Sequence, residues 1–171
     1  MEKIRRLSFL ALLSASTLFC LRTQAQSNSN VVNYQLLGDG LLMSIKYERK
    51  VLPDFNLWLN GGIGYYVQSG ETYLTLPLGV RYWQPLSKHN RNYVGIGASA
   101  TYCKADVTLY AIIEYRDKRD KPENAYINYI PALGFRHLNA KRQVTYTWEA
   151  NLVVNNFAVL PYFGFSIGFA F

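Results

Sequence analysis

The sequence has few of the residues from which enzymes build catalytic or metal centres. It contains two cysteines and two histidines in 171 residues, and only 17% of its residues are charged. His89 and His137 have no cysteine or carboxylate at metal-ligand spacing, and no glycine-rich phosphate loop or nucleophile elbow is present. We therefore predict no metal site, no cofactor and no enzymatic activity.

The chain also lacks long apolar runs and helical periodicity beyond its first 25 residues. Those residues combine a basic start, "MEKIRR", an apolar stretch, "LSFLALLSASTLF", and the small residues of "TQA". This pattern is typical of a secretory signal peptide cleaved after Ala25. A membrane anchor over 7–21 is the alternative, but that run is shorter than the roughly 20 residues of a spanning helix. A lipoprotein modified at Cys20 is disfavoured because bulky Phe19 precedes the cysteine.

We expect residues 1–25 to be a signal peptide and residues 26–171 to form one domain. The mature chain would carry 14 basic and 10 acidic residues and a net charge of about +4. These charges are scattered, with no basic patch interleaved with aromatic residues, so nucleic-acid binding is not expected. Cys103 would be the only remaining cysteine, which excludes an intramolecular disulfide.

The mature chain is instead dominated by residues that alternate between apolar and small or polar. In "LLMSIKYE", Leu41, Met43, Ile45 and Tyr47 share one face, and Leu42, Ser44, Lys46 and Glu48 share the other. The same alternation recurs in "LWLNGGIGYYV", "YLTLPLGVRYW", "YVGIGASATYC" and "VTYTWEANL". Such period-two patterns predict an antiparallel all-β fold.

The second face is rich in Gly, Ser, Thr and Ala and carries few charges, which does not fit a solvated exterior. It fits the crowded lumen of a small membrane barrel whose apolar face meets lipid. We expect the lumen charges to pair with one another as a polar network; they are Lys46, Glu48, Arg81, Arg136 and Glu149. A selective polar passage through these charges is the alternative reading.

Eight strands are predicted, an even number as bacterial single-chain barrels require. Their ranges are 31–37, 41–50, 56–68, 72–83, 93–103, 125–137, 144–153 and 161–171. Short periplasmic connections are expected at 52–55, 87–91 and 138–142. Four extracellular loops are expected at 38–40, 69–71, 104–124 and 155–160.

The segment 104–124 is the longest predicted loop. Its first part, "DVTLYAIIEY", alternates weakly and is expected to lengthen the preceding strand. A charged tip follows, made of Arg116, Asp117, Lys118, Arg119, Asp120 and Lys121. This tip is either a surface for a ligand or partner, since loops on rigid scaffolds often carry function, or a solvated cap.

Several segments resemble the small outer-membrane β-barrel proteins common in the Bacteroidota. In "NYQLLGDGLLMSIKYERKVLPDFNLWLNGGIGYY", the residues that match the pattern of that family are Gly38, Gly40, Ser44, Tyr47, Glu48 and Arg49, with Lys46 in place of its usual Asn. "LPLGVRYW", "YVGIGASATY", "IPALGFRH" and "FGFSIGFAF" resemble its later strands. The resemblance implies an eight-stranded up-and-down transmembrane barrel in the bacterial outer membrane. It implies little about activity.

Two functional alternatives remain beside a structural or surface-interaction role. One is a narrow pore or small-ligand transporter. The other is a lipid A deacylase-like enzyme, because "RHLNA" followed by Glu149 resembles the His, Ser and Glu of such barrels. Asn139 stands at the position of their serine, so the nucleophile is missing.

The final strand, "PYFGFSIGFAF", places phenylalanine or isoleucine at every second position. Phe165, Phe169 and Phe171 resemble the C-terminal aromatic signal of outer-membrane barrels. We therefore expect the barrel assembly machinery, the lipid bilayer and lipopolysaccharide as partners, and a monomer as the product.

Overall fold

The computed structural model describes residues 29–52, 55–68, 70–86, 91–105, 107, 113–114, 126–155 and 158–171. The predicted signal peptide and the charged tip at 116–121 lie outside these residues. In the part of the chain that is described, no helix is long and apolar enough to cross a membrane.

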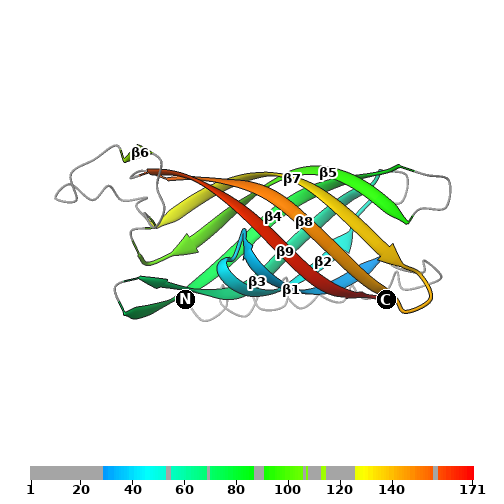
Figure 1. Ribbon diagram of the computed structural model, residues 1–171, viewed down its shortest axis with the longest axis horizontal. Coiled ribbons are helices and arrows are strands. Elements are labelled where there is room, and N and C mark those ends of the chain that lie inside the picture. Colours follow the sequence, from blue (N-terminus) through cyan, green and yellow to red (C-terminus); the bar gives the residue numbers. More distant parts are fainter. Residues whose placement is uncertain are drawn as a thin grey trace, which may run out of the picture.

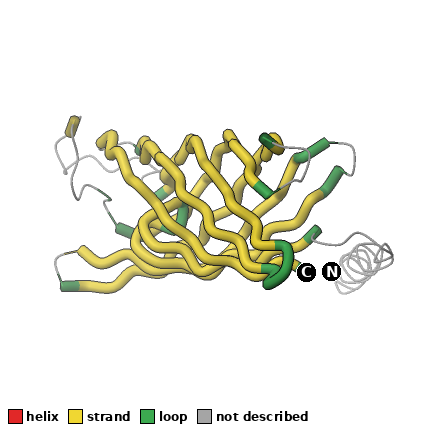
Figure 2. Tube along the Cα trace, turned by 45° about the vertical axis from the view of Figure 1, so that its right-hand side comes forward, coloured by secondary structure: helices red, strands yellow, loops and turns green. Residues whose placement is uncertain are grey.

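The fold is a closed antiparallel barrel of eight strands, as predicted, with one additional short strand. The strands are β1 (Asn30–Gly38), β2 (Leu41–Lys50), β3 (Leu57–Gln68), β4 (Glu71–Pro85), β5 (Asn92–Cys103), β6 (Ile113–Glu114), β7 (Ile127–Asn139), β8 (Val144–Val154) and β9 (Ala158–Ala170). The eight long strands pair in chain order, with β5 next to β7, and β9 pairs with β1 to close the barrel; β6 pairs with β9. Figures 1 and 2 show these strands forming one continuous wall.

The strands are staggered by ten residues around the barrel. A path along directly paired residues from Phe169 on β9, through Val32, Tyr47, Gly61, Leu78, Ala100, Tyr129 and Val154, returns to β9 at Val159. For a rise of ~3.3 Å per residue and a strand spacing of ~4.8 Å, this stagger tilts the strands by about 40°. An eight-stranded barrel of this kind encloses an interior just wide enough for side chains.

The barrel has two ends that differ in their connections. At one end, called here the C-terminal end, Asn30 and Phe171 exchange backbone hydrogen bonds of 3.0 and 2.9 Å. The connections 51–56, 86–91 and 140–143 belong to this end. At the opposite end, called here the loop end, β3 gives way to β4, β5 ends at Cys103, β7 begins at Ile127, and β8 gives way to β9.

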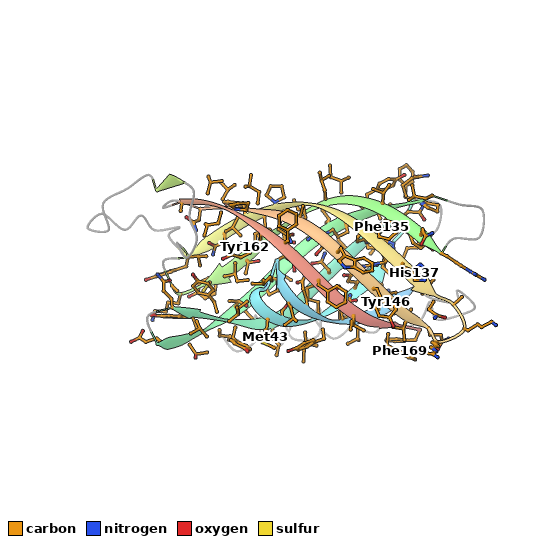
Figure 3. The ribbon with its side chains drawn as sticks, in the orientation of Figure 1. Met43, Phe135, His137, Tyr146, Tyr162 and Phe169 are labelled. Carbon is orange, nitrogen blue, oxygen red and sulfur yellow. The ribbon has the colours of Figure 1, made fainter. Side chains whose placement is uncertain are left out.

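The polarity of the barrel is inverted relative to a soluble protein. Large apolar side chains point outward along every long strand: Leu78 is 67% exposed and Phe163 is 82% exposed. Figure 3 shows Phe135 and Phe169 on this outer surface. The interior holds polar residues, among them Asn33, Gln35, Lys46, Glu48, Arg81, Thr101, Arg136, Thr147 and Glu149. The sequence alternation therefore assigned the two faces of the strands correctly, with the exception of Leu41.

The β1–β2 turn departs from the prediction. The residues Gly38, Asp39 and Gly40 were expected in an extracellular loop, but they fold into the barrel and all three are buried. Figure 1 shows this hairpin, in blue and cyan, turning back well before the loop end. Leu41, expected on the outer face, is fully buried because its backbone φ of 72° breaks the alternation.

The short strand β6 also corrects a prediction. We expected 106–115 to lengthen the strand before it, but β5 ends at Cys103 and Ile113–Glu114 pair with the start of β9. This pairing covers the edge of β9 beyond the end of β1, since β1 pairs with β9 only as far as Phe165. Most of the remaining residues of 106–115 lie outside the described part of the chain.

Apolar residues fill the barrel near its two ends. At the loop end, one cluster includes Leu41, Tyr66, Cys103, Val107, Ile130, Val153, Leu160 and Tyr162. A smaller cluster at the C-terminal end joins Val31, Leu138 and Ala170 with Trp58 and Tyr93. The polar residues of the interior lie between the two clusters and contact one another.

Candidate functional site: the lumenal polar network

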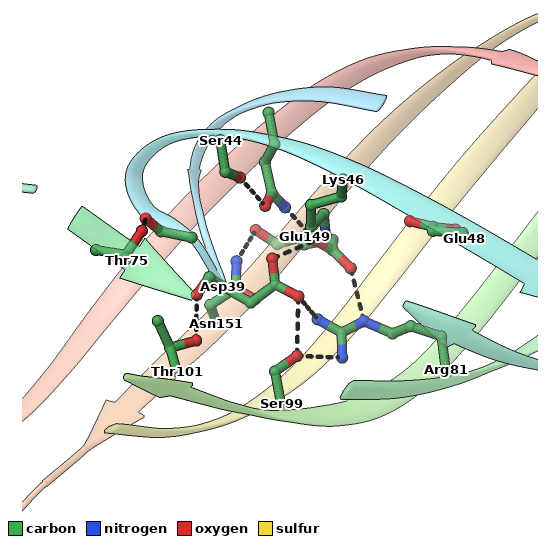
Figure 4. A network of polar contacts seen from close by, with 12 residues as sticks. Asp39, Ser44, Lys46, Glu48, Thr75, Arg81, Ser99, Thr101, Glu149 and Asn151 are labelled. Carbon is green, nitrogen blue, oxygen red and sulfur yellow. Dashed lines mark hydrogen bonds and ion pairs between the residues drawn. The ribbon is translucent and has the colours of Figure 1, made fainter. Parts of the chain in front are cut away.

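The inward-folded turn places one carboxylate at the centre of the lumen. Asp39 is fully buried, and its Oδ1 lies 2.8 Å from Lys46 Nζ of β2. Its Oδ2 accepts hydrogen bonds from Ser99 Oγ of β5 at 2.8 Å and from an Arg81 terminal nitrogen of β4 at 3.3 Å. Figure 4 shows Asp39 between these three side chains. One carboxylate thus connects the turn to three strands of the wall, β2, β4 and β5.

Arg81 continues the network across the lumen. Its Nε lies 3.0 Å from Glu149 Oε1 on β8, and its other terminal nitrogen donates to Ser99 Oγ at 3.1 Å. Glu149 Oε2 accepts from Gln35 Nε2 at 2.8 Å, and Gln35 Oε1 accepts from Ser44 Oγ at 3.3 Å. Arg81 therefore pairs with two carboxylates at once, and both are buried.

Arg136 forms a second ion pair nearer the C-terminal end. One of its terminal nitrogens lies 2.6 Å from Glu48 Oε2, and its Nε donates to Thr147 Oγ1 at 3.0 Å. The guanidinium carbon lies 4.3 Å from the ring centre of Trp83 and 5.7 Å from that of Trp58. Cation–π contact with aromatic faces favours a buried guanidinium. Among the described residues, neither Arg136 nor Glu48 forms a hydrogen bond or an ion pair with the turn.

All five of the charged lumen residues proposed from the sequence are buried inside the barrel. Lys46, Arg81 and Glu149 belong to the network around Asp39, Arg136 and Glu48 form the second ion pair, and Asp39 is a sixth charged residue that the sequence reasoning missed. The five carry three positive and two negative charges, which leaves one positive charge uncompensated. Asp39 supplies the missing negative charge. Because an unpaired buried charge is costly, this imbalance was a signal in the sequence that a further acid faces the lumen.

The backbone of the turn is held in an unusual conformation. Leu37 has φ 49° and Leu41 has φ 72°, a left-handed region that costs a bulky residue roughly 1–2 kcal/mol. The turn carbonyls are bound by wall side chains: Thr75 Oγ1 donates to Gly40 O at 2.9 Å, and Thr101 Oγ1 donates to Asp39 O. Tertiary contacts, rather than local preference, therefore keep the turn inside the barrel.

Glycines leave the space that the network occupies. A Cβ on Gly97 would lie 2.5 Å from Arg81 Cδ, and a Cβ on Gly164 would lie 2.0 Å from Leu37 O. A side chain at position 97 would displace Arg81, and a side chain at position 164 would displace Leu37, which precedes the turn. Their role here is close approach rather than backbone flexibility.

The enzyme-like arrangement does not come together. Glu149 faces the lumen, where it binds Arg81 and Gln35. His137 lies on the same face of β7 as the outward-facing residues, and its Nδ1 lies 2.7 Å from Asn92 Oδ1. Within the described segments, no three His, Cys, Asp or Glu side chains are grouped as metal ligands. His89 lies outside the described residues.

The residues of the proposed assembly signal line the outer surface at the C-terminal end. Phe169 and Phe171 are each half exposed, and their rings stack with centres 6.4 Å apart. Phe165 contacts Trp148 on β8, with ring centres 5.6 Å apart. The proposed extracellular tip, Arg116 to Lys121, lies outside the described residues.

No protein-family model matches the chain, and no curated protein matches it significantly. The resemblance to the small barrels of the Bacteroidota stays a prediction. The functional proposal therefore depends on the barrel and its lumen.

Proposed function

We propose that the protein is an integral β-barrel of the bacterial outer membrane with a structural or surface-interaction role. Its partners in this role are the lipid bilayer, lipopolysaccharide and the barrel assembly machinery. The loop end faces the outside of the cell and presents the segment 104–124. The protein acts as a monomer without a cofactor or enzymatic activity.

The inverted polarity of the barrel is the observation that supports this proposal most strongly. Residues such as Ile63, Leu78, Ile96 and Leu133 are each more than half exposed on the outside, while six charged side chains are buried inside. In water, this arrangement would leave a large apolar surface exposed, and it would pay the desolvation cost of burying charged side chains while apolar ones stayed outside. In a bilayer, the apolar band meets lipid, and closure of the barrel by β1 and β9 gives each of the eight long strands two neighbours with which to form backbone hydrogen bonds.

The filled lumen favours a structural role over a pore. Asp39 and its partners occupy the middle of the barrel, and apolar clusters fill both ends. The three positive and three negative side chains of the lumen balance, so the lumen has no excess of one charge that would attract a permeating ion. Function would then lie in the surface that the scaffold presents.

Expression of the whole chain in a Gram-negative host tests this proposal. We expect the protein to sediment with the outer membrane, to require detergent for extraction and to migrate faster on gels when the sample is not heated. The lipid A of the same cells should keep its acyl pattern in mass spectra. Recovery in the soluble fraction without detergent would contradict the membrane assignment, and a shortened acyl pattern would contradict the absence of enzymatic activity.

A further inference from the structure

We propose that the β1–β2 turn is a latch that closes the lumen from the loop end, with Asp39 as its single charged anchor. In the latched state the turn lies inside the barrel. In the unlatched state it swings out toward the loop end and opens the lumen from that side.

The latch follows from the length of the hairpin relative to its neighbours. β9 continues seven residues beyond Phe165, the partner of Leu36, as far as Ala158. A longer β1–β2 hairpin could have paired with this part of β9 and reached the loop end. Instead β1 stops at Gly38, and the next residue is fully buried in the lumen. The turn is therefore an internal element, and beyond the end of β1 the edge of β9 pairs with β6 at Ala158 and Val159 instead of with the hairpin.

One carboxylate makes all of the charged contacts of the turn. Lys46, Arg81 and Ser99 converge on Asp39 within 2.8–3.3 Å. Thr75 and Thr101 also donate hydrogen bonds to turn carbonyls, but these contacts carry no charge. Loss of the carboxylate charge therefore removes both ion pairs of the turn at once, so the charged contacts that hold the turn inside depend on this single residue.

The backbone of the turn opposes the anchor. Leu37 and Leu41 flank the turn with positive φ angles that leucine rarely adopts. Strain of this kind persists only where surrounding contacts impose it, and it is frequent in switch regions. Gly38 and Gly40 flank Asp39 because the lumen leaves no room for larger residues: a Cβ on Gly38 would lie 2.2 Å from Gln35 Nε2, and one on Gly40 would lie 2.3 Å from Ser44 Oγ. Release of Asp39 would let both leucines return to ordinary backbone angles.

Leu41 is the residue that reports the state of the latch. In the latched state it is fully buried in the apolar cluster with Tyr66 and Ile130. When the turn leaves the lumen, Leu41 leaves that cluster and reaches solvent. A thiol at this position would then change from protected to reactive.

The experiment measures the reaction of a Leu41→Cys barrel with a water-soluble maleimide in detergent micelles, with Cys20 and Cys103 replaced by alanine. We expect Asp39→Asn to raise the labelling rate about tenfold or more, since local opening controls such protection. Glu48→Gln is the matched control: it removes an equally buried carboxylate charge from the Arg136 pair, away from the turn. It should leave the labelling rate within about twofold.

Ser99→Ala provides a milder test that keeps every charge. It removes the hydrogen bond that Ser99 donates to Asp39 and the one that it accepts from Arg81, and it should raise the labelling rate by a smaller factor than Asp39→Asn. Thr147→Ala, which removes a hydrogen bond to Arg136 instead, is its control. Equal labelling of the Asp39 and Glu48 variants would overturn the latch. If Asp39→Asn does not fold, equal labelling of the Ser99 and Thr147 variants would overturn it.

Discussion

Replacement of Arg81 by leucine is expected to lower the free energy of unfolding by about 3–5 kcal/mol, the usual cost of removing one partner from a buried ion pair. Arg81 pairs with both Asp39 and Glu149. Among the described side chains, its loss leaves Glu149 with the neutral Gln35 as a partner and leaves Asp39 with Lys46 and Ser99. Urea unfolding in lipid vesicles, followed by gel mobility, measures the change.

Two further variants make this experiment specific. Arg142→Leu removes an arginine from the exposed β7–β8 turn and should change stability by no more than about 0.5 kcal/mol. The double variant Arg81→Leu with Glu149→Leu removes both partners of one ion pair, so it should be more stable than the single Arg81 variant. A single Arg81→Leu barrel as stable as the wild type would show that the lumenal network contributes little.

An arginine in place of Leu78 is expected to destabilise the inserted barrel by about 2–4 kcal/mol, the cost of a lipid-facing charge at the bilayer midplane. Leu78 lies at the middle of β4 and is 67% exposed on the outer face. The same change on the surface of a soluble barrel would remove an exposed apolar group and cost almost nothing. The effect therefore separates lipid from water as the surroundings of this face.

Thr72→Arg is the control for position along the strand. Thr72 lies on the same face of β4 near the loop end and is exposed. Near an interface the cost of arginine falls to about 0–1 kcal/mol. Urea titration of both variants after insertion into vesicles measures the difference. Equal stability of the Leu78 and Thr72 variants would contradict a bilayer centred on the middle of β4.

The strands were predictable from sequence because their alternation is a local property. Each residue of a long strand faces outward or inward according to its parity, and the polarity of the inward set revealed a lumen rather than a soluble core. Ile45 and Lys46 illustrate this, since one is 56% exposed and the other is fully buried. The predicted second strand, 41–50, matches β2 residue for residue.

The turn was not predictable in the same way because its position depends on tertiary contacts. "GDG" is compatible with an exposed hairpin loop and with a buried turn, since glycine tolerates both. Asp39 is held inside by Lys46, Arg81 and Ser99, residues from three other parts of the sequence. Only the charge imbalance among the predicted lumen residues indicated that a further acid was needed. The pairing of β6 with β9 is likewise non-local, and no pattern in 113–114 indicates it.

Tryptophan fluorescence in vesicles of bromine-labelled lipids tests the central claim, an inverted barrel embedded in a bilayer, most directly. The chain has three tryptophans: Trp148 is half exposed on the outer face, Trp83 is fully buried in the lumen, and Trp58 packs with the inner cluster at the C-terminal end. Bromine on the acyl chains should quench the wild type strongly, and Trp148→Phe should abolish most of that quenching while Trp58→Phe leaves it. Equal quenching in all three proteins, or none in the wild type, would contradict the inverted barrel in a membrane.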